Sequence, residues 1–80
     1  MKTAKTKLSK ITQATYILAW ENDSYSLICI EESITNGTVE IYKASSLTKS
    51  KALANKIFKK IVKGKVFGVT LLDVIYNLIA

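Results

Sequence analysis

Residues 14–45 have a strand-like pattern of apolar runs that are rich in Ile, Val, Thr and Tyr and are separated by polar turn signals. Two turn signals divide this segment. Asn36-Gly37 is the stronger one, because both central residues of a type I′ turn need a positive φ, which Asn and Gly tolerate. The weaker one is the polar stretch 21–24. The pattern predicts a three-stranded antiparallel meander, with strands at about 14–21, 24–34 and 38–44.

Two-residue loops at these turns would fix the register of the strands. The second loop would pair Ile34 with Val39, and the first would pair Trp20 with Tyr25. Alternation then sorts the side chains onto two faces, and a three-residue first turn would invert the first strand. One face is aliphatic: Ile17, Ile28, Ile30, Ile34, Val39 and Ile41. The other face is rich in aromatic residues: Tyr16, Leu18, Trp20, Tyr25, Leu27, Cys29 and Tyr42. Either register leaves apolar side chains on both faces.

After the predicted sheet, the apolar period becomes helical. Five apolar residues form a single stripe at helical spacing: Leu53, Ala54, Ile57, Phe58 and Ile61. Ser46 or Thr48 is the expected N-cap, and Gly64 is the expected residue C′ that ends the helix. Lysines occupy the remaining surface of this first helix.

A second helix is expected from Thr70 to about Leu78, because Thr70 and Asp73 have the spacing of a capping box. The predicted fold is therefore α+β, with a three-stranded antiparallel β-meander followed by two C-terminal α-helices (β-β-β-α-α). Residues 1–12 carry four lysines and no acid, and we expect them to form a disordered basic tail. Residues 13–80 then form a single domain, since 80 residues leave no room for a second.

Charge is segregated along the chain, whose formal net charge is +6. Residues 13–42 carry five acids and no lysine, whereas residues 43–66 carry eight lysines and no acid. Such a balance raises the possibility of nucleic-acid binding through the basic tail and helix, with Lys49, Lys56, Lys60 and Lys63 as the contact residues. Without any arginine, the bidentate contact to guanine is left to lysine alone, and the acids of the strands would repel phosphate.

The composition argues against an enzyme. The chain has no histidine and one cysteine, which excludes Ser-His-Asp triads, histidine-ligated metals and internal disulfides. Cys29 is expected to be a buried, inert thiol, and Asp73 to be a helix cap. We therefore expect no catalytic residue, cofactor, metal or small-molecule substrate.

The expected location is the cytoplasm. The single cysteine fits a reducing compartment. The apolar stretch 66–80 is interrupted by Asp73 and Asn77 and is shorter than the ~20 residues that a membrane span requires.

Several segments resemble a family of small uncharacterised Firmicutes proteins, classed as a domain of unknown function. The segments are Tyr16-Ile17-Leu18, the run from Tyr25 to Ile30, the charged helix and the ending Leu71-Leu72-Asp73-Val74. The resemblance covers residues 16–80. This family carries Pro, His and acids where Gly68, Thr70, Tyr76 and Asn77 stand here. The resemblance supports the domain bounds and the compartment, and it implies no activity.

Protein association is the function that the pattern favours. Two helices on one side of the sheet can cover only one face, so the other face would expose apolar side chains. We expect a non-catalytic interaction module that forms a homodimer or binds another protein. The expected interface consists of Tyr16, Leu18, Trp20, Tyr25 and Tyr42. The alternative is a nucleic-acid-binding accessory protein without sequence preference, which would use the lysines named above.

Overall fold

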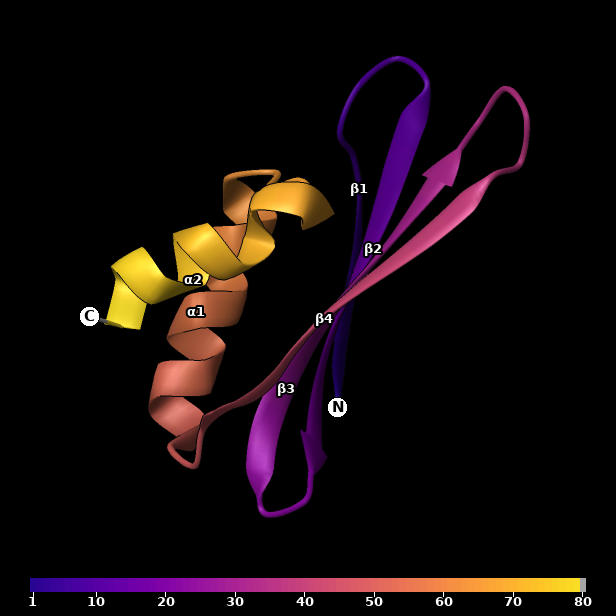
Figure 1. Ribbon diagram of the computed structural model, residues 1–80. Helices are drawn as coiled ribbons and strands as arrows, with labels where there is room; N and C mark the ends of the chain where they lie inside the picture. Colours follow the sequence, from indigo (N-terminus) through magenta and orange to yellow (C-terminus); the bar gives the residue numbers. More distant parts are fainter. Residues whose placement is uncertain (80) are drawn as a thin grey trace.

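The computed structural model describes residues 1–79 as two layers, a twisted β-sheet and a pair of helices (Figure 1). The strands are β1 (Lys2–Lys7), β2 (Thr12–Glu21), β3 (Ser24–Ser33) and β4 (Val39–Thr48). The helices are α1 (Lys51–Lys63), the short 3-10 helix η1 (Gly68–Thr70) and α2 (Leu71–Ile79). All the helices lie against the same face of the sheet (Figure 1). The fold is thus α+β, as the sequence predicts, with one sheet face covered.

The sheet has four antiparallel strands in the order β1-β2-β3-β4, one more than the sequence predicts. The additional strand, β1, occupies the segment that was expected to be a disordered tail. Ala4 faces Tyr16 across the β1–β2 pair, and Ala4 and Leu8 pack against the core. Thr3 and Thr6 add β-branched side chains, which favour strands. The basic segment is therefore the first edge of the sheet.

The register between β2 and β3 confirms the prediction from the first turn. Trp20 faces Tyr25, and Leu18 faces Leu27. The two loop residues Asn22 and Asp23 both have positive φ, at 51° and 61°, as a type I′ turn requires.

The register between β3 and β4 differs from the prediction by two residues. Val39 faces Glu32 rather than Ile34, because four residues (34–37) instead of two separate the hydrogen-bonded residues Ser33 and Thr38. Ser33 N–H donates to the carbonyl of Thr38 (2.8 Å), and the Asn36 side chain accepts from Thr38 N–H (3.0 Å). A shift of two leaves every side chain on its predicted face.

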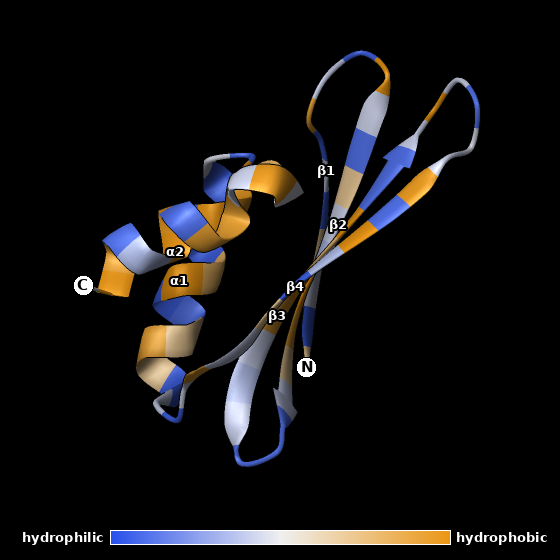
Figure 2. Ribbon diagram, viewed as in Figure 1, coloured by the Kyte–Doolittle hydropathy of each residue, from blue (hydrophilic) through white to orange (hydrophobic). Residues whose placement is uncertain are grey.

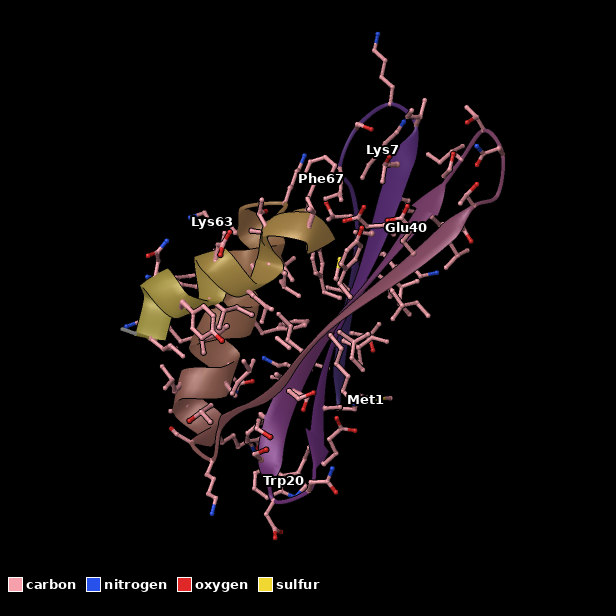
Figure 3. All side chains as sticks on the ribbon, viewed as in Figure 1. Met1, Lys7, Trp20, Glu40, Lys63 and Phe67 are labelled. Atoms are coloured by element: carbon pink, nitrogen blue, oxygen red, sulfur yellow. The ribbon has the colours of Figure 1, made fainter. Side chains whose placement is uncertain are left out.

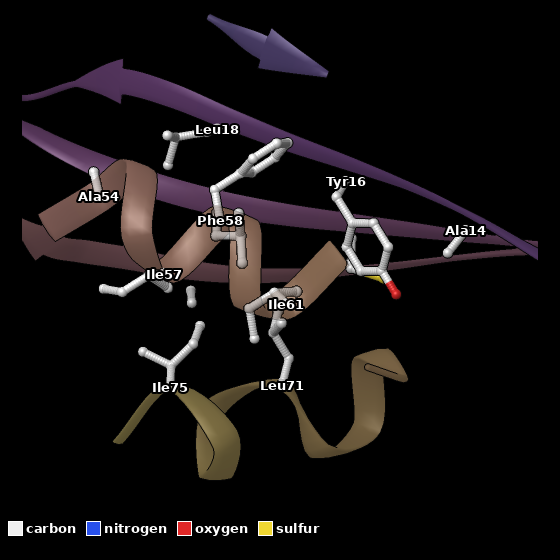
Figure 4. Close-up of a cluster of buried hydrophobic side chains, with 12 residues drawn as sticks. Ala14, Tyr16, Leu18, Ala54, Ile57, Phe58, Ile61, Leu71 and Ile75 are labelled. Atoms are coloured by element: carbon white, nitrogen blue, oxygen red, sulfur yellow. The ribbon is translucent and has the colours of Figure 1, made fainter. Parts of the chain in front are cut away.

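The core lies between the aromatic-rich face of the sheet and the two helices (Figure 4). The sheet contributes Ala14, Tyr16, Leu18, Leu27, Cys29 and Ala44. The helices contribute Ala54, Ile57, Phe58, Ile61, Leu71 and Ile75. The predicted apolar stripe of α1 is thus buried except for Leu53, which is half-buried.

Both ends of α1 differ from the expected caps. Its N-cap is Ser50, whose hydroxyl accepts from Leu53 N–H (3.2 Å), because β4 continues to Thr48. At the other end Gly64 has a helical φ of −79°, and the left-handed residue C′ is Lys65, with a φ of 49°. Val66 N–H donates to the carbonyl of Ile61 (3.3 Å), which completes a Schellman motif.

The two helices differ in polarity. Helix α2 is apolar over most of its surface, whereas α1 alternates apolar residues with lysines (Figure 2). Among residues 1–79, none of the helices combines the length and hydrophobicity needed to cross a membrane.

Candidate interaction surfaces

The five residues expected at the interface do not form one exposed surface. Tyr16 and Leu18 lie in the core, at 0% and 3% exposure, so they cannot meet a partner while the chain is folded. Tyr25 and Tyr42 are half-buried against that core. Trp20 is exposed at the β2–β3 turn, with its ring edge-on to that of Tyr25 at 4.9 Å (Figure 3). The structure corrects the prediction, because the helices cover the face on which it placed the interface.

The opposite face of the sheet is uncovered, and it is the aliphatic one. Three of its isoleucines are half-buried and two β4 residues are exposed: Ile17, Ile28, Ile30, Val39 and Ile41. The sequence identifies this set of residues as a face but does not show that the helices avoid it. We call these five residues the aliphatic face.

One ion pair borders the aliphatic face. Lys43 Nζ lies 2.5 Å from Glu21 Oε1. Hydrogen bonds from Lys43 and Ser26 lower the pKa of the Glu21 carboxyl. The charge of Lys43 is therefore matched within its own chain.

A groove runs beside the free edge of β4, between that strand and η1 with the start of α2. Its volume is about 380 Å³. The lining residues are Ile41, Tyr42, Lys43, Gly68, Val69, Leu71 and Leu72. Val69 and Ile41 are the most exposed of these large apolar side chains, at 76% and 68%. Sequence reasoning missed this groove, because it began the second helix at Thr70 and assigned no structure to Gly68 and Val69.

Polar anchors hold η1 close to the sheet. Tyr16 O–H donates to the carbonyl of Val66 (2.6 Å), and the Glu31 carboxylate accepts from Gly68 N–H. A Cβ added at Gly68 would overlap the Tyr42 ring, so only glycine fits there. Two side chains of the sheet thus fix the segment that forms the wall of the groove.

The chemistry of the buried groups is that of structural side chains. Burial raises the pKa of the Cys29 thiol to about 11, so the thiol stays protonated at neutral pH. Tyr42 O–H donates to Glu40, and this bond raises the pKa of Tyr42 to about 12. Within residues 1–79, no group of three or more His, Cys, Asp or Glu side chains is placed to hold a metal ion.

The lysines proposed for nucleic-acid binding are brought partly together. Lys56, Lys60 and Lys63 recur at four- and three-residue spacing and are exposed on the side of α1 that faces away from the core, and Lys59 lies beside them. Lys49 is exposed in the connection before α1. We call the four helical lysines the basic face of α1. Within residues 1–79, none of them forms an ion pair.

No known protein family matches the sequence, and no curated protein or solved structure is significantly similar to it.

Proposed function

We propose that the chain is a small non-catalytic protein-interaction module that acts as a homodimer. The observation that supports this proposal is the position of the helices, which cover one face of the sheet and leave the aliphatic face open. The exposed apolar side chains continue from that face around β4 to Val69 and Leu72. Contiguous apolar surface of this kind marks interaction sites on soluble proteins.

The energetics favour association. Each Å² of apolar surface removed from water contributes roughly 25 cal/mol, so covering several aliphatic side chains yields several kcal/mol before the costs of association. A domain of this size has a small core, and its stability is only about 5–15 kcal/mol. A two-fold symmetric dimer lets a single surface cover itself, which is the commonest way to bury such a patch.

Sedimentation velocity across a concentration series tests the proposal. We expect a dimer in the low micromolar range, and Ile41→Lys should shift the equilibrium to monomer. Ile41 is 68% exposed, so the protomer tolerates the lysine. Ile11→Lys is the matched control, because Ile11 is also exposed, at 53%, but lies in the β1–β2 loop. A wild-type chain that stays monomeric at all concentrations contradicts the proposal.

A second candidate is nucleic-acid binding without sequence preference, through the basic face of α1. The observation that favours it is that lysines of α1 converge on one solvent-facing side without an acidic partner among residues 1–79. Proteins that bind phosphates in this way release counterions, so their affinity falls steeply with salt. The absence of arginine limits such binding to the backbone of the nucleic acid.

Salt titration of binding to random duplex DNA tests this candidate. The slope of log K against log salt should fall by about 0.9 for each phosphate contact removed. The slope should therefore be shallower for a triple variant that combines Lys56→Gln, Lys60→Gln and Lys63→Gln. Lys5→Gln, Lys7→Gln and Lys10→Gln remove the same charge from the β1 end and serve as the control. Equal losses in the two triple variants, or no binding at low salt, exclude a site on α1.

A further inference from the structure

The two edges of the sheet are protected differently. β1 carries three lysines, Lys2, Lys5 and Lys7, and charged side chains on edge strands prevent pairing with other chains. β4 carries one lysine, Lys43, whose charge is matched by Glu21, and one acid, Glu40, which accepts a hydrogen bond from Tyr42 O–H. The edge of β4 is therefore open to an additional strand, while that of β1 is blocked.

The backbone groups free for such pairing follow from the register. Ser33 N–H donates to the carbonyl of Thr38, and the Ser33 carbonyl accepts from Gly37 N–H, so both backbone groups of Ser33 point to the β4 side of β3. Because hydrogen-bonded pairs alternate along antiparallel strands, residues 40 and 42 also bond to β3. The N–H and C=O groups of Val39, Ile41 and Lys43 then point away from the sheet.

Apolar side chains flank this edge on both sides. Val39 and Ile41 belong to the aliphatic face, and Val69 and Leu72 lie on the helical side in the groove beside β4. A strand added to β4 would cover both sets and satisfy the free backbone groups.

We propose that the added strand is β4 of a second copy, paired antiparallel about a two-fold axis at Ile41. Two four-stranded sheets then form one continuous sheet with both helical layers on the same side. The inference rests on the proposed homodimer and specifies the surface by which it forms.

The avoidance of like-charge pairs favours a second copy paired about Ile41 over one paired about Glu40 or Lys43. A two-fold axis normal to the sheet places one residue opposite itself. An axis at Glu40 would oppose two carboxylates, and one at Lys43 would oppose two ammonium groups, which is destabilising. An axis at Ile41 instead places Glu40 opposite the partner's Tyr42, which is uncharged, so no like charges face each other. It also places Val39 opposite the partner's Lys43.

Cysteine crosslinking tests the pairing directly. In Ile41→Cys the two introduced thiols would face each other across a hydrogen-bonded pair, whose Cα separation of about 5.5 Å a disulfide spans. We expect mild oxidation to convert most of the protein to a covalent dimer. Lys5→Cys on β1 and Ile30→Cys on the aliphatic face are the matched controls and should stay uncrosslinked. Wild type should also stay uncrosslinked, because Cys29 is buried.

A proline substitution tests the backbone bonds. Ile41→Pro removes an N–H that points outward and leaves the β3–β4 bonds intact, which edge strands tolerate. We expect at least a tenfold weaker dimer with an unchanged circular dichroism spectrum. Ile41→Thr keeps both the N–H and a β-branched side chain, so most of the dimerisation should remain.

The outcomes separate this inference from the proposed function. Suppose that wild type dimerises, that Ile30→Cys or Lys5→Cys forms a crosslink, and that Ile41→Cys does not. The module is then a homodimer, and the β4 pairing is overturned. Loss of the dimer in Trp20→Ser but not in Ile41→Pro also overturns it. If wild type is monomeric throughout, both proposals fail.

Discussion

Single residues fix the position of the wall of the β4 groove. Tyr16 spans the core from β2 to the segment before η1, where its hydroxyl donates to the carbonyl of Val66. Gly68 then brings η1 into contact with the ring of Tyr42. These two contacts connect the covered face of the sheet to the exposed groove. Removing either one should lower the free energy of unfolding.

Tyr16→Phe should destabilise the fold by about 1–3 kcal/mol, because it leaves the partly buried Val66 carbonyl without its donor. Urea denaturation followed by circular dichroism measures this loss. Tyr76→Phe removes a hydroxyl from a side chain that is 62% exposed, and it should change stability little. Equal stabilities for Tyr16→Phe and wild type would show that water replaces the bond at no cost.

Gly68→Ala should cost about 1–3 kcal/mol, since the added methyl group forces η1 or the Tyr42 ring to move. A double-mutant cycle with Tyr42→Ala identifies the cause, because removing the ring should relieve most of the penalty. Additive losses in the double variant would mean that the alanine acts through some other contact.

At the level of elements, the face on which each strand residue lies was predicted from the sequence more accurately than the ends of the strands were. The Asn22-Asp23 turn gave the β2–β3 register correctly, because both residues adopt the positive φ that their side chains tolerate. The stronger-looking Asn36-Gly37 signal gave a register two residues off. There Asn36 accepts from Thr38 N–H and only Gly37 has a positive φ, so the loop widens.

Two features could not be obtained from the pattern. The β1 segment has no apolar side chain larger than that of Ala4, and its lysines resemble those of a disordered tail until β2 is present to pair with it. Both faces of the sheet are apolar, so the pattern alone does not select the face that the helices cover. The covered face includes the small residues Ala14 and Ala44, which let the helical layer approach, whereas isoleucines fill the other face.

The C-terminal end of α1 gives a prediction at this scale. Lys65 occupies the left-handed residue C′, a conformation that costs a non-glycine residue about 1–2 kcal/mol. Lys65→Gly should relieve that strain and, after the larger entropy of the unfolded glycine chain, stabilise the protein by about 0.5–1 kcal/mol. Thermal unfolding measures the gain. Lys63→Gly replaces a residue within α1, so it should destabilise the protein by about 0.5–1 kcal/mol. A stability gain in both variants would contradict the role of residue C′.

On the scale of the whole molecule, the lysines of the basic face and the aliphatic face belong to different layers, the helices and the sheet. The lysines of the basic face are exposed on α1, outside the core, and the aliphatic face lies on the side of the sheet opposite the helices. A β4-paired dimer would therefore keep the basic faces exposed. Dimerisation and nucleic-acid binding use different surfaces and can be tested independently.

The whole fold should lose stability at alkaline pH because its core buries protonated acids. Burial raises the pKa of Cys29 from 9.0 to about 11 and raises that of Tyr16 well above 10.0. The bond to Glu40 raises the pKa of Tyr42 from 10.0 to about 12. In each case the unfolded chain releases its proton at a lower pH than the folded chain does. Stability is therefore full below pH 9 and falls as pH rises through the folded pKa values.

Urea midpoints measured from pH 7 to pH 11 test this dependence. We expect a plateau to about pH 9 and a progressive decline above it. Tyr16→Phe and Cys29→Ala remove the two buried acids, so their double variant should start from a lower plateau and decline less steeply. Tyr76→Phe removes an exposed phenol and should keep the wild-type slope. A midpoint that stays constant to pH 11 would show that the buried groups ionise as easily in the folded chain as in the unfolded one.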